Sequence, residues 1–200
     1  MSSKINVLQV IPKLGFGGAE TGCYDIAHYL AEQDCGSYLA TSGGELLKFV
    51  KKNKVKVIRL PVHSKNPFII LINVFRLLKI IKKNEINIIH ARSRAPAWSC
   101  YLAAKLANIK FITTFHGTYN FSNRIKKFYN SIMIRSDYII AISNFIYSEI
   151  RTKYLYTKEN ISIILRGVDI NYFNPSLIDH YLLKQQMAQY ALRKNSIKIV

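Results

Sequence analysis

Acidic side chains are scarce in this 200-residue chain: 11 Asp and Glu stand against 29 Lys and Arg, which gives a formal net charge of +18. Such an imbalance favours anionic partners, namely phosphates, nucleic acid or an acidic lipid surface. Part of the lysine excess matches the coding bias of an AT-rich genome, because Ile and Asn are abundant as well. Half of the residues are hydrophobic, so the chain is globular rather than disordered.

Cysteine is also rare. Cys23, Cys35 and Cys100 are odd in number, have no CxxC spacing and have no ligand-type histidine nearby. These features argue against a disulfide framework and against zinc, and they are typical of a reducing compartment. We expect no metal and no other cofactor.

A long apolar run is missing. The longest, residues 68–81, is interrupted by Asn73, Arg76 and Lys79 and is too short to span a bilayer. The first twelve residues lack the basic region, the apolar core and the cleavage site of a signal peptide. We therefore expect a cytoplasmic protein.

Short β-branched runs alternate with helical stretches along most of the sequence. Strands are predicted at residues 5–11, 37–41, 55–60, 86–89, 110–115, 138–142 and 161–165. Helices are predicted at residues 19–33, 45–53, 68–84, 95–107, 124–135 and 144–153. This alternation, with near-continuous apolar strands, indicates an α/β fold: a doubly wound parallel, Rossmann-like sheet with helices on both faces.

The pattern changes after about residue 170. Residues 177–193 are predicted to form a polar helix and residues 196–200 to begin another strand. A strand without a following crossover cannot complete a βαβ unit. We therefore expect a Rossmann-like domain over residues 1–175, and over residues 176–200 an interdomain segment with the first strand of a second domain that is missing.

Ligands of open α/β sheets bind outside the carboxyl ends of the strands, so the residues that follow each strand are the candidates for a site. These are residues 15–20, Ser42–Gly44, His63, residues 90–94, residues 116–118, Ser143–Asn144 and residues 166–169. Three of the five histidines, His63, His90 and His116, are among them.

The first of these segments is a glycine-rich turn that contains Gly17 and Gly18. Glycines after a strand let a phosphate approach the backbone, and the next helix offers free N–H groups. Glu20 stands where the dinucleotide motif GxGxxG needs its last glycine, and the Gly-Lys-Ser/Thr ending of a P-loop is missing. A phosphate or sugar contact and a plain tight turn both remain open.

His116 and the basic residues near His90 are the other candidates. His116 can donate to a hydroxyl or a phosphate, or act as a general base, unless it only satisfies a loop carbonyl. The fork of donors on arginine suits phosphate, so Arg92 and Arg94 with His90 indicate an anion site. Arg94 can instead be a simple surface charge.

Taken together, these segments resemble the acceptor-side domain of the family 4 (group 1) glycosyltransferases, which have the two-domain GT-B architecture. The segments that carry the resemblance are residues 8–20, 90–96, 115–117, 136–144 and 166–175. Their order and spacing fit across nearly the whole chain, and the nearest group is the bacterial one that builds lipopolysaccharide and other surface glycans.

The resemblance implies a role for each matched residue. Gly17 and Gly18 would face the diphosphate or the transferred sugar of a nucleotide-sugar donor, and His116 would lie beside the reacting sugar as the catalytic residue. The acceptor, a glycan or glycolipid, would lie in a cleft lined by His90, Arg92, Arg94 and Asn144. The family holds its donor mainly in the second domain with a Glu-x7-Glu pattern, and no glutamate pair here has that spacing.

Two classes of function follow. The first is a domain for retaining glycosyl transfer that is incomplete as a single chain, so whether the chain alone is an enzyme is uncertain. The second is a non-catalytic module that keeps affinity only for acceptor or membrane. Nucleic-acid binding is not expected, because neither an aromatic RNA-binding signature nor a helix-turn-helix pattern is present.

The helix predicted over residues 68–84 is relevant to whether the protein binds a membrane. It is apolar around most of its circumference, with Asn73, Arg76, Lys79 and Lys83 on a narrow polar stripe. This breadth reflects either packing on both sides or a basic-apolar rim, shared with Arg124, Lys126 and Lys127, that lies on anionic lipid. The second alternative would make the protein peripheral on the inner face of the membrane.

Overall fold

The computed structural model describes residues 4–119, 123–168, 170–171, 174 and 176. The chain divides into two compact units, Met1–Leu165 and Arg166–Val200. In the second unit, the Asn174 side-chain oxygen accepts a hydrogen bond of 3.0 Å from the Ser176 backbone N–H. The helix and strand expected after residue 176 lie outside the described residues, and the domain boundary expected there stays a prediction.

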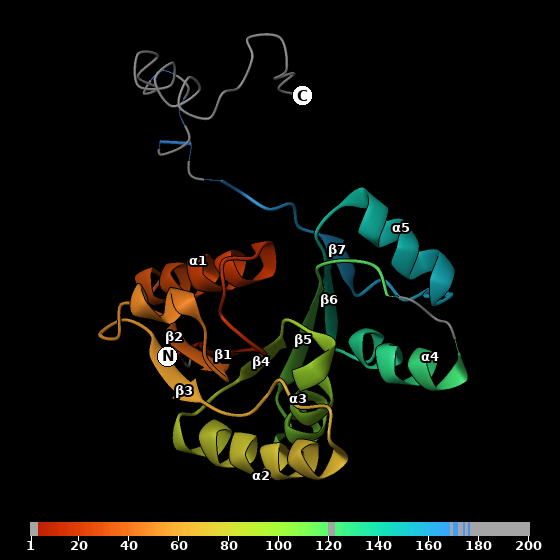
Figure 1. Ribbon diagram of the computed structural model, residues 1–200, viewed down its shortest axis with the longest axis horizontal. Helices are drawn as coiled ribbons and strands as arrows, with labels where there is room; N and C mark the ends of the chain where they lie inside the picture. The colour runs from red at the N-terminus through yellow and green to blue at the C-terminus, as the bar shows by residue number, and fades with distance from the viewer. Residues whose placement is uncertain (1–3, 120–122, 169, 172–173, 175, 177–200) are drawn as a thin grey trace, which may run out of the picture. The chain divides into compact units, whose positions relative to one another are not determined.

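The first unit is built on a seven-stranded, fully parallel sheet in the order β3-β2-β1-β4-β5-β6-β7 (Figure 1), which confirms the predicted fold. The strands are β1 (Asn6–Ile11), β2 (Gly36–Thr41), β3 (Lys56–Arg59), β4 (Ile88–Ala91), β5 (Lys110–Phe115), β6 (Tyr138–Ala141) and β7 (Ile161–Ile163). The helices are α1 (Gly18–Glu32), α2 (Pro67–Lys83), α3 (Arg94–Ala107), α4 (Arg124–Asn130) and α5 (Asn144–Lys153), with short 3-10 turns η1 (Glu45–Lys48) and η2 (Ser131–Ile134).

The strand order decides which face each helix covers. From β1 the chain moves outward to β2 and β3, then returns to β4 and moves outward in the other direction to β7. Because parallel crossovers are right-handed, α1 and η1 cover one face, and α2 to α5 cover the other. The reversal between β1 and β4 creates a switch point at the centre of the sheet, where open α/β folds bind ligands.

Each face has its own core. On the α1 side, Leu14, Cys23 and Leu39 belong to a small cluster of buried apolar residues. On the other side, a larger cluster includes Leu77 of α2 and Phe111 of β5. The strands are apolar toward both faces, which explains why they read as nearly continuous hydrophobic runs in the sequence.

Two predicted helices are shorter than expected. Instead of a helix over residues 45–53, only η1 forms, because the Lys51 N–H donates to the His28 ring at 3.1 Å rather than to a helical carbonyl. The helix predicted over residues 124–135 ends at Asn130 and continues as η2, where the Met133 carbonyl accepts the Thr113 hydroxyl at 2.7 Å. At Lys51, a partner distant in sequence takes a backbone N–H that the predicted helix would use.

Two further expectations need correction. The fourth strand lies two residues later than predicted, because the Ile86 N–H still bonds to Ile81 in the turn that ends α2, so His90 lies inside β4. Asn73 does not belong to a polar stripe on α2: it is 1% exposed and donates to the Pro61 carbonyl at 3.1 Å.

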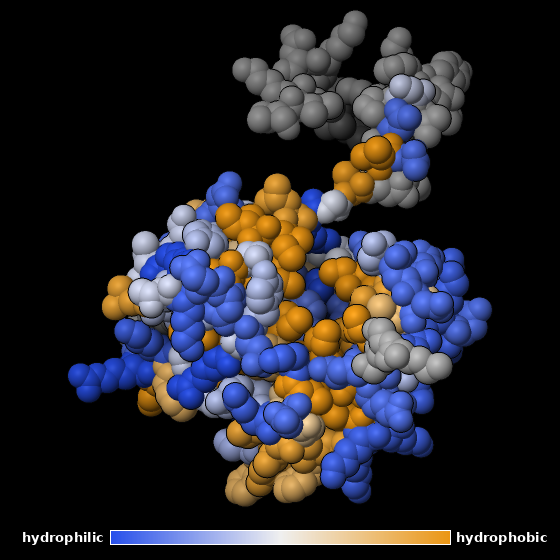
Figure 2. Space-filling view, turned by 180° about the vertical axis from the view of Figure 1, so that it is seen from behind, coloured by the Kyte–Doolittle hydropathy of each residue, from blue (hydrophilic) through white to orange (hydrophobic). Residues whose placement is uncertain are grey.

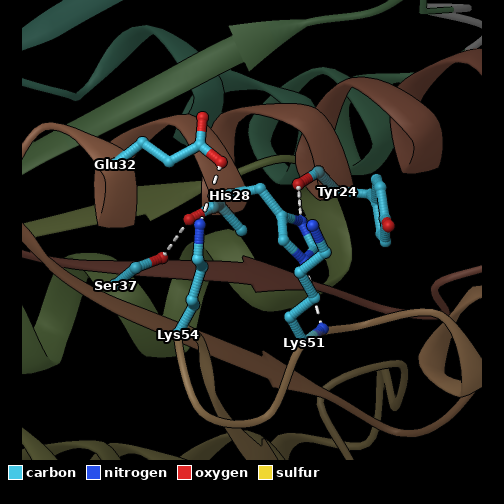
Figure 3. Close-up of polar contacts among 7 residues, drawn as sticks. Tyr24, His28, Glu32, Ser37, Lys51 and Lys54 are labelled. Carbon is cyan, nitrogen blue, oxygen red and sulfur yellow. Dashed lines mark hydrogen bonds and ion pairs between the residues drawn. The ribbon is translucent and has the colours of Figure 1, made fainter.

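Helix α1 is fastened to the β2–β3 region by polar contacts (Figure 3). The His28 Nε2 accepts from the Lys51 backbone N–H, and its Nδ1 lies 2.9 Å from the Tyr24 carbonyl oxygen. A neutral ring with the proton on Nδ1 satisfies both contacts. Lys54 pairs with Glu32 at 3.2 Å nearby. His28 is therefore part of the scaffold.

Candidate functional site

The strand order brings most of the predicted site residues to one edge of the sheet. β1, β4, β5 and β6 are consecutive neighbours, about 4.8 Å apart. Their carboxyl ends carry, in that order, the turn with Gly17 and Gly18, the segment with Arg92 and Arg94, His116, and Asn144. His63 follows β3 at the outer edge and stands apart from this group.

The glycine turn after β1 leads directly into α1. Gly17 is the N-cap, and its carbonyl accepts from the backbone N–H groups of Glu20 at 3.1 Å and Thr21 at 2.9 Å. Gly17 and Gly18 are exposed, and no side chain caps the helix. The first N–H groups of α1 therefore offer free donors, with the positive end of the helix dipole, to an anion.

A second glycine pair, Gly43 and Gly44 after β2, supports the first turn. The Leu14 N–H donates to the Gly43 carbonyl at 2.7 Å, and the Leu46 N–H donates to the Leu14 carbonyl at 3.0 Å. Gly44 has a φ of +136°, and a Cβ there would overlap the backbone of Leu14. Although this pair also follows a strand, it holds the loop after β1 in place through Leu14.

A buried polar cluster lies at the centre of the sheet behind the edge. His90 is 6% exposed, and its Nε2 lies 2.7 Å from the Thr114 hydroxyl of the neighbouring strand. Arg92 is 5% exposed, and its guanidinium donates to the Gln9 side-chain oxygen at 3.1 Å. Gln9 in turn donates to the Cys23 carbonyl of α1 at 3.1 Å, so it connects this cluster to the helix that follows the glycine turn.

The electrostatics of this cluster keep one histidine neutral. The pKa of His90 lies well below its usual value, mainly because burial disfavours the imidazolium, and the charges of Arg92 and His116 act in the same direction. Burial likewise raises the pKa of the neighbouring Cys23 thiol to about 12. The cluster therefore concentrates its positive charge on Arg92.

His116 follows β5 and is half-buried at the edge itself. Its charge contributes to the lowered pKa of His90, and the two histidines lie in and directly after neighbouring strands of the sheet. A half-buried imidazole that follows a strand of the sheet can move a proton or donate to a ligand oxygen. Of the predicted residues, Arg92, His116 and His90 are thus brought together.

Arg94 is held by side chains of its own surroundings. Its guanidinium donates to the Asn130 side-chain oxygen at 2.9 Å and lies 4.1 Å from the centre of the Tyr119 ring. Burial raises the pKa of Tyr119 to about 12, while the Arg94 charge opposes that shift. Tyr129 and Tyr154 also feel the Arg94 charge. Arg94 is therefore held by Asn130 and the Tyr119 ring.

Asn144 begins α5 and is exposed at the same edge. The preceding Ser143 caps the helix, because its hydroxyl accepts from the Ile146 N–H at 3.2 Å. This leaves the Asn144 amide at the surface, next to Phe145, which is also exposed.

Sequence reasoning missed Gln9. The signal was a polar residue inside the apolar run of the first strand, since a fully buried amide needs partners. Within the described residues, no group of three or more His, Cys, Asp or Glu is arranged to hold a metal ion, and no helix has both the length and the apolar character needed to cross a membrane.

Comparisons with known proteins agree with this geometry. Residues 16–172 match the family model described as Glycosyltransferase Family 4. A glycosyltransferase from Rickettsia africae ESF-5 is 41% identical, with a TM-score of 0.81, over 96% of this chain and 51% of that one. Among curated proteins none matches the chain significantly.

More distant structures share the fold. HepE from Anabaena, solved in complex with UDP and glucose, is 19% identical with a TM-score of 0.72, over 92% of this chain and 50% of that one. The lipopolysaccharide outer core galactosyltransferase WaaB is 16% identical with a TM-score of 0.61, over 82% of this chain and 46% of that one. The chain thus spans about half the length of these GT-B enzymes. Because the family model covers well over half of the sequence, the chain belongs to glycosyltransferase family 4.

Proposed function

We propose that the chain is the amino-terminal, acceptor-side domain of a retaining glycosyltransferase that uses a nucleotide-sugar donor to build lipopolysaccharide or another surface glycan. Family membership supports glycosyl transfer as the reaction. HepE is solved with UDP and glucose, and WaaB is a lipopolysaccharide galactosyltransferase, which supports the donor class and the kind of product.

One observation carries the proposal: the exposed start of α1 and the Arg92–His116 cluster share one edge of the sheet. Glycosyl transfer separates a diphosphate anion from an oxocarbenium-like sugar. Fixed N–H donors and a buried cation beside that charge stabilise it without reorganising.

Each predicted residue has a role in this proposal. Gly17 and Gly18 present backbone N–H groups to the donor diphosphate or sugar, and His116 acts beside the reacting sugar as a proton carrier or hydrogen-bond donor. Arg92, Arg94 and Asn144 line the acceptor cleft. His90 is neutral and buried below this cleft, and its hydrogen bond with Thr114 holds the strands that carry the cleft residues.

The acceptor is a glycan or glycolipid, and we place the protein in the cytoplasm, peripheral on the inner face of the membrane. The basic excess of the chain is compatible with both the phosphates of the donor and an anionic leaflet.

The test is complementation. Purified chain is mixed with the carboxyl-terminal half of the 41% identical Rickettsia africae protein, the half that this chain does not cover, and UDP-sugar consumption is measured. We expect transfer by the mixture and negligible turnover by either part alone, because the family holds its donor mainly in the second domain. Turnover by this chain alone at roughly 1 per second, an ordinary enzymatic rate, would contradict the proposal.

The second candidate is a non-catalytic module that binds acceptor or membrane. The basic excess of the chain, a net charge of +18, favours it, because such a charge attracts anionic acceptors and lipids without any catalytic group. Glycan or glycolipid binding by the chain, together with inactivity in every complemented mixture, would support this alternative.

A further inference from the structure

The outer surface of α2 changes character along the helix. Its inner side contributes Val74, Leu77 and Ile81 to the core. Its outer side carries four exposed large apolar residues, all in the first half of the helix and 48–78% exposed: Phe68, Leu71, Ile72 and Phe75. Large apolar side chains gathered on an open surface mark an interaction site.

The second half of the same surface is basic. Four exposed cations follow the apolar group: Arg76, Lys79, Lys82 and Lys83. The helix contains no acidic residue, and none of the ion pairs among the described residues involves it. These charges thus lack a carboxylate partner within the described part of the chain.

Helix α4 repeats this composition on the same face of the sheet. Ile125 and Phe128 are 79% and 60% exposed and are interspersed with Arg124, Lys126 and Lys127. The Phe128 ring lies 5.3 Å from Trp98 of α3, and α3 packs against α2. Helices α2 and α4 therefore flank α3, and together they present two apolar-basic surfaces.

The direction of α2 along the sheet determines which end of the helix lies nearer the candidate site. A crossover helix starts at the carboxyl edge of the sheet and runs antiparallel to the strands, so the end with Phe68 is nearer the edge that carries Arg92 and His116. In Figure 2, hydrophobic residues reach the surface at the lower end of the molecule, where α2 lies, with hydrophilic residues beside them.

We propose that the outer surface of α2, assisted by α4, docks on an anionic lipid bilayer, with the apolar first half of α2 inserted between the headgroups and the basic second half on their phosphates. Charge complementarity selects this occupant, because α2 and α4 together carry seven cations beside the six exposed apolar residues named above. An uncharged protein groove would leave those cations unpaired.

This inference rests on the proposed membrane location and gives it a surface and an orientation. The inserted end adjoins the edge with the candidate site, so a lipid-linked acceptor would reach His116 without leaving the bilayer. It does not depend on catalysis, so its failure would leave the proposed glycosyl transfer standing.

The experiment is vesicle co-sedimentation of the full chain with neutral phosphatidylcholine vesicles and with vesicles that also contain phosphatidylglycerol. Each lysine near an anionic leaflet changes affinity about fivefold, so Lys79→Gln with Lys83→Gln should weaken binding about 30-fold. The matched control is Lys51→Gln with Lys52→Gln, two exposed lysines after η1 on the other face, which should change binding less than threefold.

A second pair of variants tests insertion. Phe68→Gln with Phe75→Gln should weaken binding to anionic vesicles at least tenfold, whereas Phe49→Gln, which alters a similarly exposed phenylalanine near η1, should not. Equal losses from the two lysine pairs would show that only the net charge of the chain acts and would overturn the proposal. Equal binding to neutral and anionic vesicles, no binding at all, or unchanged binding after the phenylalanine substitutions would also overturn it.

Discussion

Two glycine pairs follow neighbouring strands of this sheet, and they differ in what they do. Gly43 and Gly44 both have positive φ, and the backbone of Leu14 fills the space where a side chain of Gly44 would be. Gly17 and Gly18 are exposed, have ordinary φ values and leave the first turn of α1 open. One pair fixes a loop, and the other leaves a helix start free for a ligand.

The difference teaches how this edge is preorganised. The loop with the locked pair holds Leu14, three residues before the open pair: the Leu14 N–H donates to the Gly43 carbonyl, and the Leu14 carbonyl accepts from the Leu46 N–H. On the other side, Gln9 joins α1 to Arg92. The open turn is therefore held between two rigid attachments, which is what a site for a charged transition state requires.

The largest effect is expected at the locked pair. Gly44→Ala would force both an unfavourable φ and an overlap with Leu14, so we expect it to lower the free energy of unfolding by at least about 3 kcal/mol. Urea denaturation followed by circular dichroism measures this loss. A change below about 1 kcal/mol would show that the loop yields easily and would break the contrast between the two glycine pairs.

The next effect is expected at the attachment between α1 and Arg92. Gln9→Leu removes a buried acceptor of a charged hydrogen bond, and such bonds contribute about 1.5–3 kcal/mol. We expect a loss of about 2 kcal/mol by urea denaturation. The exposed Gln33→Leu is the control and should stay within about 0.5 kcal/mol of the parent. Equal effects at the two positions would mean that Gln9 does not hold Arg92.

A pH dependence should follow from His90. Its pKa is lowered in the folded state, so the unfolded chain binds its proton first as the pH falls below the ordinary histidine pKa near 6.5. Stability due to neutral His90 is therefore complete at neutral pH and is lost on acidification, by at most about 1.4 kcal/mol per pH unit. Urea midpoints between pH 7 and pH 5 should fall less steeply in His90→Gln. Parallel profiles would contradict the assignment.

The smallest effect on stability is expected at the open pair. Gly17→Ala replaces an N-cap glycine and displaces only the flexible Glu20 side chain, so we expect a loss below about 1 kcal/mol. The same substitution should lower transfer in the complemented mixture, because its methyl group crowds the start of α1. Stability and transfer that fall together would show that this turn is scaffold as well.

Much of the fold could be predicted from sequence because its signals are local. The alternation of apolar runs with helical stretches identified all seven strands and the parallel sheet. The ends of elements were less certain: the helix predicted after β2 stops at η1 because His28, from a distant part of the chain, accepts a backbone N–H that the helix would use. Such competition has no local signature.

The candidate site, too, could be predicted only in part. Strand ends could be read from the sequence, and the sheet order does bring Gly17, Arg92, His116 and Asn144 to one edge. The burial of His90 could not be read, because it depends on Thr114, which is 24 residues away. The roles of these residues in binding and transfer stay predictions.

The most direct test of the central claim, that this edge performs the chemistry, is the turnover of His116→Ala in the complemented mixture. We expect a loss of about a hundredfold, the range of a general acid-base group, with little change in the urea midpoint. The matched control is His63→Ala, which removes a strand-end histidine held by Ser42 at the outer edge of the sheet, and it should leave turnover within about threefold. A His116→Ala mixture as active as its parent would contradict the account and make His116 a structural residue.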